Sequence, residues 1–216
     1  MVKASTEPHG AAMGDAVVLW AARYDLLIWL LTLGRERKFR DRLLVPARLG
    51  PGESVLDVGC GTGTLAIAAK ERVGPSGSVH GVDASLPMIA RATRKALKAN
   101  VDVSFEYAAA ESLPFPDARF DVVLCTVMLH HLSRDTRQQG VREMRRVLKP
   151  GGRLFAVDFG AGAEQRKGLI GHLHRHGGIK PHALRALVTN VGLEIVESGA
   201  FGIWDLQFVL AEVPRV

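Results

Sequence analysis

The amino-acid sequence predicts an α/β protein with a mostly parallel sheet and helices packed on both of its faces. Short apolar segments of strand length alternate with longer helical segments five times along the chain. The run FDVVLCT at 120–126 is apolar on both faces, as a central parallel strand requires. Two further strands, at 193–197 and 206–213, are separated by a short loop and predict an antiparallel hairpin that closes the sheet.

Glycine and proline mark the boundaries of the other elements. A strand at 55–58 leads through a glycine-rich turn into a helix at 65–72, which is closed by residues 74–77. The remaining expected elements are strands at 78–82, 103–107 and 153–158, helices at 87–98, 134–148 and 181–191, and a turn at 149–152. Residues 160–178 are rich in glycine and histidine, and we expect them to form a mobile connection that covers the site.

Composition sets broad limits on the class of protein. The 216 residues, 47% of them hydrophobic and 23% charged, suit one globular domain of ordinary size. The net charge of +6 is compatible with binding to nucleic acid, with binding to anionic lipid, or with a role in solubility alone. Cys60 and Cys125 lie in apolar strand contexts without a CxxC partner, which argues against a disulfide framework or a cysteine metal site. Their use suits a reducing, cytoplasmic compartment.

The first 48 residues differ in pattern from the rest of the chain. Residues 1–14 are polar, lack the basic-then-apolar pattern of a signal peptide and are expected to be a flexible leader. Residues 15–48 predict an N-terminal helical cap, broken near Gly34, ahead of a domain at 49–216. Arg23 and Asp25 interrupt the apolar part of this cap, which argues against a membrane span.

Two interpretations of the cap remain open. In the first, its apolar face packs on the core and its basic stretch at 35–42 stays in water. In the second, it is a peripheral anchor on an anionic membrane, with Trp20 and Trp29 at the level of the lipid headgroups.

The stretch VLDVGCGTGT at 55–64 is the main functional signal. Gly59, Gly61 and Gly63 permit a sharp strand-to-helix turn and let the backbone approach a ligand closely. The free N–H groups at the start of the following helix add positive potential. Such a loop predicts a nucleotide-like cofactor without specifying which one.

Asp57 narrows the choice of cofactor. Its carboxylate would repel a pyrophosphate, and Thr64 occupies the position of the third glycine in dinucleotide sites, so an NAD-dependent dehydrogenase is disfavoured. The ammonium and sulfonium groups of S-adenosylmethionine would instead be attracted. The alternative interpretation is that Asp57 only orders the loop by accepting hydrogen bonds from its amides.

Asp83 ends the second strand, 20 residues after Gly63, at the separation where a strand-end acid meets a ribose in nucleotide folds. A carboxylate can accept hydrogen bonds from two vicinal hydroxyls, so the residue type fits. The alternative is that Asp83 caps the helix that begins near Leu86. Met88, close to the start of that helix, either packs on the adenine face or fills the core.

Histidines are the candidates for acid–base chemistry. His130 and His131 follow the strand at 120–126, and imidazole is suited to act as a general base near neutral pH. A structural role for each of them remains open. His172, His174 and His176 alternate in sequence but lack a helical His-x-x-x-His pair with an acid, so no metal site is expected.

Four stretches together carry a family resemblance: VLDVGCGTGTLA (55–66), GVDASLPMI (81–89), AESLPFPDARFDVV (110–123) and VLKPGGRL (147–154). They resemble the class I S-adenosylmethionine-dependent methyltransferases, and within them the methyltransferase type 11 group with the ubiquinone and menaquinone C-methyltransferases. The resemblance implies a Rossmann-like, seven-stranded, mostly parallel sheet with a reversed last strand. It also implies that S-adenosylmethionine is the cofactor.

The same resemblance implies a role for each candidate site residue. The methionine portion would be held by Asp57, Gly59, Cys60, Gly61, Thr62 and Gly63, the ribose by Asp83 with the adjoining Ala84, and the adenine by Met88, Ala109, Ala110 and Glu111. Thr126 and His130, with Tyr24 and Trp29 from the N-terminal segment, would line the path to the acceptor.

Several positions differ from the relatives that the sequence resembles. Residues 22–27 are similar to the entry helix of the quinone methyltransferases and of some bacterial phospholipid N-methyltransferases. The quinone enzymes usually carry Asn-Asp in place of Ile28-Trp29 and Arg-Asn in place of His130-His131, and the family often has Asp or Asn in place of Ala109. The Pro-Pro-Tyr motif of nucleobase N-methyltransferases does not follow the fourth strand, so nucleic acid is not an expected partner.

The sequence therefore predicts transfer of a methyl group to a small, hydrophobic acceptor, either a lipid or a quinone-like molecule. The protein is expected to be a monomer or homodimer in the cytoplasm, and peripheral contact with a membrane is left open. The protein's main task would be to align the acceptor with the methyl group and to exclude water. The alternative is a non-catalytic methyltransferase-like domain that binds the cofactor or a partner protein without turnover.

Overall fold

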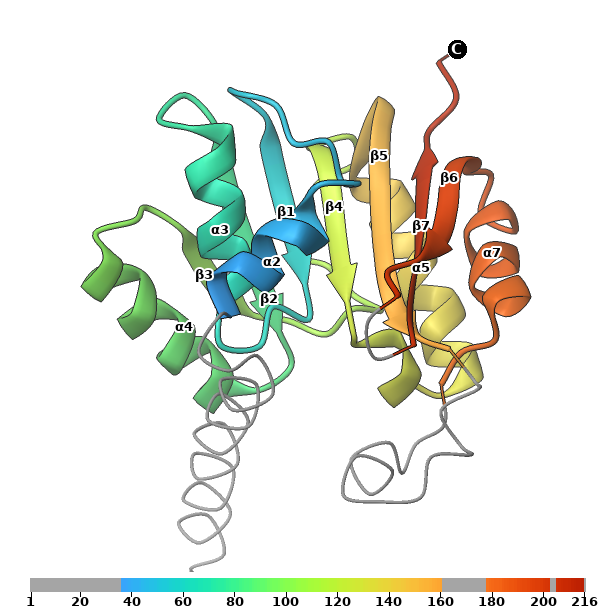
Figure 1. Cartoon of the computed structure of the whole chain (residues 1–216), viewed down its shortest axis with the longest axis horizontal. Helices are drawn as coiled ribbons and strands as arrows, with labels where there is room; N and C mark the ends of the chain where they lie inside the picture. The colour runs from blue at the N-terminus through green and yellow to red at the C-terminus, as the bar shows by residue number, and fades with distance from the viewer. Residues whose placement is uncertain (1–35, 161–177, 203–204, 216) are drawn as a thin grey trace, which may run out of the picture.

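The computed structural model describes residues 36–160, 178–202 and 205–215, which form a seven-stranded sheet flanked by helices (Figure 1). Its strands are β1 (Ser54–Val58), β2 (Ser78–Asp83), β3 (Ser104–Tyr107), β4 (Phe120–Thr126), β5 (Leu148–Phe159), β6 (Glu194–Ala200) and β7 (Leu206–Glu212). They lie in the order β3-β2-β1-β4-β5-β7-β6. Strand β7 is antiparallel to both β5 and β6, and the other pairs are parallel, which confirms the predicted sheet with a reversed last strand.

Helices cover both faces of this sheet. They are α2 (Glu36–Leu44), α3 (Thr64–Val73), α4 (Leu86–Ala99), α5 (Arg134–Val147) and α7 (Pro181–Thr189), with the short 3₁₀ helix η1 (Leu129–His131) after β4. Helices α2 and α3 share one hydrophobic core with the sheet, whereas α5 and α7 share the other. None of the helices in the described ranges is long and apolar enough to cross a membrane.

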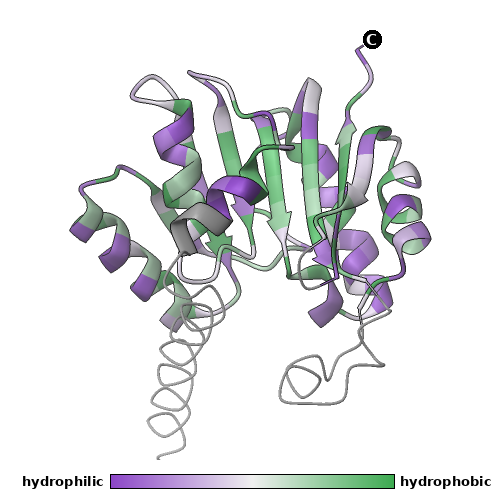
Figure 2. Ribbon diagram, viewed as in Figure 1, coloured by the Kyte–Doolittle hydropathy of each residue, from purple (hydrophilic) through white to green (hydrophobic). Residues whose placement is uncertain are grey.

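The two cores follow from the two-residue period of the strands. Val55, Val122 and Phe155 face the side of α2 and α3, and their neighbours Leu56, Val123 and Ala156 face the side of α5 and α7. All six are fully buried, as expected for a parallel sheet covered on both sides. Figure 2 shows the result, with mostly hydrophobic strands inside and hydrophilic residues on the outer sides of the helices.

Two sequence expectations about this fold are wrong. Residues 149–152 do not form a turn before β5 but a bulge inside it, because Phe120 pairs with Leu148 and Val122 already pairs with Arg153. The bulged backbone keeps its hydrogen bonds, since Gly151 and Gly152 pair with Val213. The strand–helix alternation is also interrupted, because residues 108–119 join β3 to β4 without a helix.

Other boundaries move by a few residues. Strand β6 continues to Ala200 instead of ending at Glu197, since it pairs along β7 over that length. Of the expected N-terminal cap the structure describes α2 and the residues that follow it, and Leu43 and Leu44 are buried against the α3 side of the core. The expected leader at 1–14, the first part of the cap and nearly all of the 160–178 connection lie outside the described residues.

The parallel strands β2, β1, β4 and β5 are neighbours in the sheet, so their carboxyl ends lie along one edge. The chain runs from β1 outwards to β2 and later returns to β4 on the other side of β1. Ligands of open α/β sheets bind where the strand order reverses in this way. Asp57, Asp83, Thr126 and Asp158 are all within two residues of these strand ends.

Candidate active site

Asp57 is a buried acid without a hydrogen-bond partner among the described residues. Its side chain is 1% exposed, and neither carboxylate oxygen forms a hydrogen bond with the part of the chain that the structure describes. Burial raises the pKa of Asp57 to about 7; the Arg40 guanidinium of α2 opposes this and the nearby Asp83 adds to it. The Ala66 amide lowers this pKa slightly, without the geometry of a hydrogen bond. Since an unpaired buried carboxylate is costly, this position suits a cationic ligand group.

The idea that Asp57 only orders the glycine loop is wrong, because its oxygens accept no hydrogen bond from the loop. Asp83 performs that task. Its Oδ2 accepts the N–H of Gly61 at 2.9 Å, and its Oδ1 accepts the N–H of Ser85 at 3.0 Å. Ser85 is the residue that precedes the first turn of α4, so Asp83 orders both the loop and the start of this helix. Each oxygen keeps a further lone pair for a ligand hydroxyl.

The three glycines of the loop differ in what surrounds them. All have positive φ, namely +72° at Gly59, +53° at Gly61 and +79° at Gly63. A Cβ at Gly59 would lie 2.5 Å from Met128, and one at Gly63 would lie 2.7 Å from Phe105. A Cβ at Gly61 would meet nothing within 4 Å. Gly59 and Gly63 are therefore required by packing, whereas Gly61 borders open space.

Polar contacts tie the loop to α4. Lys95 donates through Nζ to the hydroxyls of Thr62 at 2.9 Å and Thr64 at 2.7 Å. The Thr62 side chain is buried, and so is Cys60, whose thiol pKa is raised by burial. The loop is therefore held in place before any ligand binds, and its cysteine is a protonated, unreactive thiol.

The loop after β3 lies beside Asp83. The Ala108 amide donates to the Asp83 carbonyl at 3.2 Å, and the buried Ala110 packs against Gly140 of α5. Ala109 and Glu111 are half-buried. On the other side of Asp83, Ala84 is exposed and Met88 is half-buried in the first turn of α4. The expected adenine and ribose residues thus flank a single strand end.

His130 lies on η1 and forms a close contact with a buried acid from β5. Its Nδ1 is 2.6 Å from Oδ1 of Asp158, a side chain that is 1% exposed. The chain reaches η1 through Thr126 at the end of β4 and Val127, whose φ of +55° is rare for a β-branched residue. Such backbone strain costs roughly 1–3 kcal/mol and concentrates at functional sites. His131 is exposed, and its ring lies on that of His130 with centroids 3.8 Å apart.

Sequence reasoning missed three residues at this edge. Asp158 follows the same pattern as Asp83, an acid at the end of an apolar strand, and could have been found by it. Ser85, two residues after Asp83, has a buried hydroxyl that forms no hydrogen bond within the described ranges. Arg40 had no signal beyond being one of several basic residues in α2.

The remaining predicted positions lie elsewhere. Tyr24 and Trp29, and the histidines at 172, 174 and 176, are outside the described residues. Within the described ranges, no group of three or more His, Cys, Asp or Glu side chains gathers as a metal site would require.

Comparison with known proteins agrees with this geometry. A family described as "Methyltransferase domain" matches residues 55–152. The demethylmenaquinone methyltransferase of Deinococcus radiodurans is 39% identical over 169 residues, which is 78% of this chain and 68% of that protein. The ubiquinone/menaquinone biosynthesis C-methyltransferase UbiE of Hahella chejuensis is 37% identical over 155 residues, 71% of this chain and 60% of that protein.

The chain belongs to the S-adenosylmethionine-dependent methyltransferases. The crystal structure of a SAM-dependent methyltransferase from Aquifex aeolicus has the same fold, with a TM-score of 0.70 at 24% identity over 81% of this chain and 89% of that one. This methyltransferase is thus an enzyme that uses S-adenosylmethionine as its cofactor, and a non-catalytic binding domain is not favoured.

The residues present fit this cofactor. The buried Asp57 oxygens lack a partner that an ammonium group would supply, and Arg40 influences Asp57 electrostatically without a hydrogen bond to it. Gly61 borders open space where a ligand can approach the backbone, and the Ser85 hydroxyl is a further unpaired group near Asp83. Polar groups without partners therefore lie along the same strand ends as the sequence-predicted site.

Gly61→Ala should separate cofactor binding from folding. Its methyl group meets no protein atom, so only the strain of φ +53° should act on stability, about 1–2 kcal/mol. The same methyl group enters the ligand space and should weaken S-adenosylmethionine at least about tenfold, measured by calorimetric titration. Gly192→Ala, which also has positive φ and open surroundings, is the matched control that keeps wild-type affinity. Unchanged affinity in Gly61→Ala would contradict the placement.

Asp57 should make cofactor affinity depend on pH. Because its folded pKa is about 7, binding of a cationic group requires loss of a proton below that pH. Affinity should rise up to tenfold per pH unit from pH 5.5 and level off above about pH 7. Asp57→Asn should bind weakly at every pH, with this slope removed. A slope that persists in Asp57→Asn would assign the proton to another group.

The same variant has a predicted effect on stability. The raised pKa means that the folded protein keeps a proton that the unfolded chain releases above pH 3.8, so stability is lost as pH rises through about 7. In urea unfolding without cofactor, the free energy of unfolding of Asp57→Asn should therefore increase relative to that of wild type as pH rises from 4 to 8, by up to roughly 4 kcal/mol.

Proposed function

We propose that this methyltransferase transfers a methyl group to a ring carbon of a small, hydrophobic, quinone-like acceptor in its reduced, dihydroxy form. The names of the relatives support this proposal, since the match at 39% identity is named a demethylmenaquinone methyltransferase and the match at 37% a ubiquinone/menaquinone biosynthesis C-methyltransferase. The observation that carries it from the structure is His130, a candidate base at the cofactor edge of the sheet. A hydroxylated ring needs such a base, because loss of the hydroxyl proton makes the ring carbon nucleophilic.

For the cofactor we propose the following assignment. Asp57 would bind the ammonium group and Arg40 the carboxylate of the methionine portion, with Gly59–Gly63 along it. Asp83 and Ser85 would bind the ribose hydroxyls, and the half-buried Met88, Ala109 and Glu111 would surround the adenine, with Ala84 and Ala110 beside them. The unpaired Asp57 oxygens and the open space at Gly61 support the first part of this assignment.

In the proposed reaction His130 accepts a proton through Nε2 from the acceptor hydroxyl, and the oxygen's electron pair is delocalised onto the neighbouring ring carbon. When bound, S-adenosylmethionine supplies the methyl group, whose bond to sulfur breaks with the electron pair remaining on sulfur. The ring carbon forms the new bond to the methyl group and then loses its hydrogen as a proton to solvent, which restores the aromatic ring as a phenolate. His130 then returns its proton to the phenolate oxygen, which regenerates both the hydroxyl group and the neutral imidazole. One proton is released overall. Thr126 lies at the start of the path by which the acceptor would enter.

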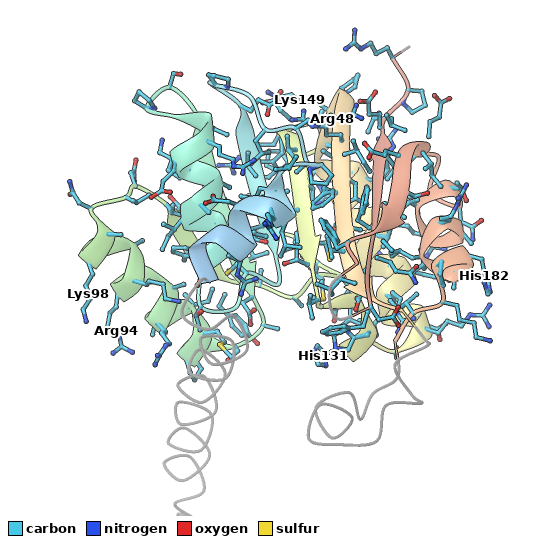
Figure 3. All side chains as sticks on the ribbon, in the orientation of Figure 1. Arg48, Arg94, Lys98, His131, Lys149 and His182 are labelled. Atoms are coloured by element: carbon cyan, nitrogen blue, oxygen red, sulfur yellow. The ribbon has the colours of Figure 1, made fainter. Side chains whose placement is uncertain are left out.

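We also propose that the protein works in the cytoplasm as a monomer or homodimer, without nucleic acid, and that it contacts anionic membranes at their surface. In this proposal the segment 15–48 caps the site and meets the lipid. A membrane-dissolved acceptor with a prenyl tail would make such contact useful. Helix α4 supports it, since Leu86 and Leu97 are 64% and 74% exposed. Arg94 and Lys98 extend from the same helix into solvent (Figure 3).

Turnover with defined acceptors tests the proposed reaction. A chemically reduced 1,4-naphthoquinone with one short prenyl chain should gain one labelled methyl group on its free ring carbon, whereas phosphatidylethanolamine should gain none. His130→Ala should lower kcat about 10²–10⁴-fold and leave the cofactor Kd within about twofold. His182→Ala, on the exposed surface of α7 (Figure 3), is the control that keeps wild-type kcat. If only the amine of phosphatidylethanolamine were methylated, the proposal of a quinone-like acceptor would be wrong and a lipid acceptor would take its place.

Flotation with vesicles tests the membrane contact. The protein should float with phosphatidylglycerol vesicles at low salt and be released at 1 M salt, because screening shortens the reach of its basic groups. Neutral phosphatidylcholine vesicles are the control. The pair Arg94→Glu and Lys98→Glu should reduce flotation without affecting cofactor affinity. No binding to anionic vesicles would remove the membrane from the proposal.

A further inference from the structure

We propose that Asp158 is the positioning residue for this reaction: it holds the imidazole of His130 as the Nδ1–H tautomer, so that the basic Nε2 faces the acceptor. The proposal rests on the proposed function, because it concerns the nitrogen that takes the acceptor's proton. Asp158 and His130 are 28 positions apart in the sequence, so no local sequence pattern connects them.

Three N–H groups converge on this one carboxylate. Its Oδ1 accepts the backbone N–H of Phe159 at 2.8 Å, and its Oδ2 accepts the backbone N–H of His130 at 3.1 Å. Because backbone N–H groups can only donate, both oxygens already act as acceptors. Since an ionised carboxylate has no proton to donate, the proposal assigns the third contact, 2.6 Å to Nδ1 of His130, as a hydrogen bond that the imidazole donates. A neutral ring that donates through Nδ1 carries its lone pair on Nε2.

The neighbours of His130 hold the ring in one orientation. One side of it lies against His131, and Phe159 meets it edge-on with centroids 5.5 Å apart. The side chain is 10% exposed. Its Nε2 accepts no hydrogen bond from the described residues. This nitrogen is also not fully buried, so solvent can reach it. The arrangement leaves the basic atom accessible and the other nitrogen occupied.

Arg137 fixes the segment that carries His130. It donates through Nε to the Leu129 carbonyl at 2.8 Å and through Nη2 to the Leu132 carbonyl at 3.0 Å, which are the two residues that flank His130 and His131. The Arg137 guanidinium and the buried Cys125 thiol both interact electrostatically with Asp158, and His130 contacts the same carboxylate. The carboxylate is thus placed to stabilise the imidazolium that forms when Nε2 accepts a proton.

A purely structural alternative exists, in which Asp158 only anchors η1 by accepting the two backbone N–H groups. The two roles make different predictions for Asp158→Asn. The asparagine amide keeps the size of the side chain but can donate to Nδ1, which favours the opposite, Nε2–H tautomer. An anchoring role requires a loss of stability only, whereas a positioning role requires a change in the ring's tautomer and in its proton affinity.

The experiment combines nitrogen NMR with kinetics on the full chain. In ¹⁵N-histidine-labelled protein, the His130 signals are assigned with His130→Gln and should show the Nδ1–H tautomer in wild type and its loss in Asp158→Asn. With the reduced prenyl naphthoquinone, Asp158→Asn should lower kcat about 10²–10³-fold, leave KM and cofactor Kd within about threefold, and move the acidic limb of the pH–kcat profile downward by about one unit.

Two further variants distinguish positioning from folding. The double variant Asp158→Asn/His130→Gln should be no slower than His130→Gln alone, because Asp158 acts only through His130. Asp121→Asn is the matched control, since this carboxylate also accepts a backbone N–H and a cation, from Ser54 and Lys149, at the opposite end of β4. It should lower stability and leave both kcat and the His130 tautomer unchanged.

Opposite results would overturn the proposal. They are an Nε2–H tautomer in wild type, or a folded Asp158→Asn with wild-type kcat and pH profile. Multiplicative losses in the double variant would assign Asp158 an effect independent of His130 and overturn it as well. Absence of methyl transfer by wild type would refute the proposed acceptor instead, and the NMR arm would still decide the tautomer.

Discussion

The site depends on one unsatisfied interaction, the buried carboxylate of Asp57. Most buried side chains of the described strands are apolar, and the sheet can bury these strands on both faces because the ladders pair their backbone groups. Asp57, at the end of β1, is a polar exception that is buried, forms no hydrogen bond with the described residues and has a raised pKa. Such a group destabilises the free protein, and in the proposed assignment it becomes favourable when the cationic group of the cofactor binds, which would couple stability to cofactor binding at this residue.

The carboxylates of Asp57, Asp83 and Asp158 lie along the same edge of the sheet but differ in their hydrogen-bond partners, and therefore in their roles. Asp83 is occupied by the amides of Gly61 and Ser85 and therefore orders the loop and helix that surround it. Asp158 accepts two backbone N–H groups and lies 2.6 Å from Nδ1 of His130, so it links the ring that we propose as the base to the sheet. Asp57 accepts none. The difference lies in which donors the neighbouring loops supply, and not in the strands, since all three acids end apolar parallel strands.

The fold of this enzyme does not by itself determine which acceptor it methylates. The sheet, the glycine loop and the strand-end acids agree with the cofactor, and a similar structure at 24% identity shows that this scaffold tolerates wide sequence change. In the proposed function the acceptor is selected further along the edge, beyond Thr126, where Val127 has a strained backbone and η1 carries His130 and His131. These two histidines replace the Arg-Asn pair usual in the quinone enzymes that the sequence resembles. Under the proposed function, this replacement would place a base of different chemistry at the same position, as expected for a related acceptor held in a different way.

The sequence by itself determined the features that depend on local rules. The period of the apolar residues predicted the strands, Gly59, Gly61 and Gly63 predicted the turn after β1, and acids after apolar runs predicted the edge where ligands bind. Only the tertiary structure decided what depends on distant partners. Residues 149–152 stay within β5, where Gly151 and Gly152 form hydrogen bonds with Val213. Asp57 accepts no hydrogen bond from the described residues, because the Gly59 and Cys60 amides donate to the Val82 carbonyl and the Gly61 amide donates to Asp83. Asp158 meets His130 because β5 lies beside β4, and no local pattern can express a contact that arises from the order of strands in a sheet.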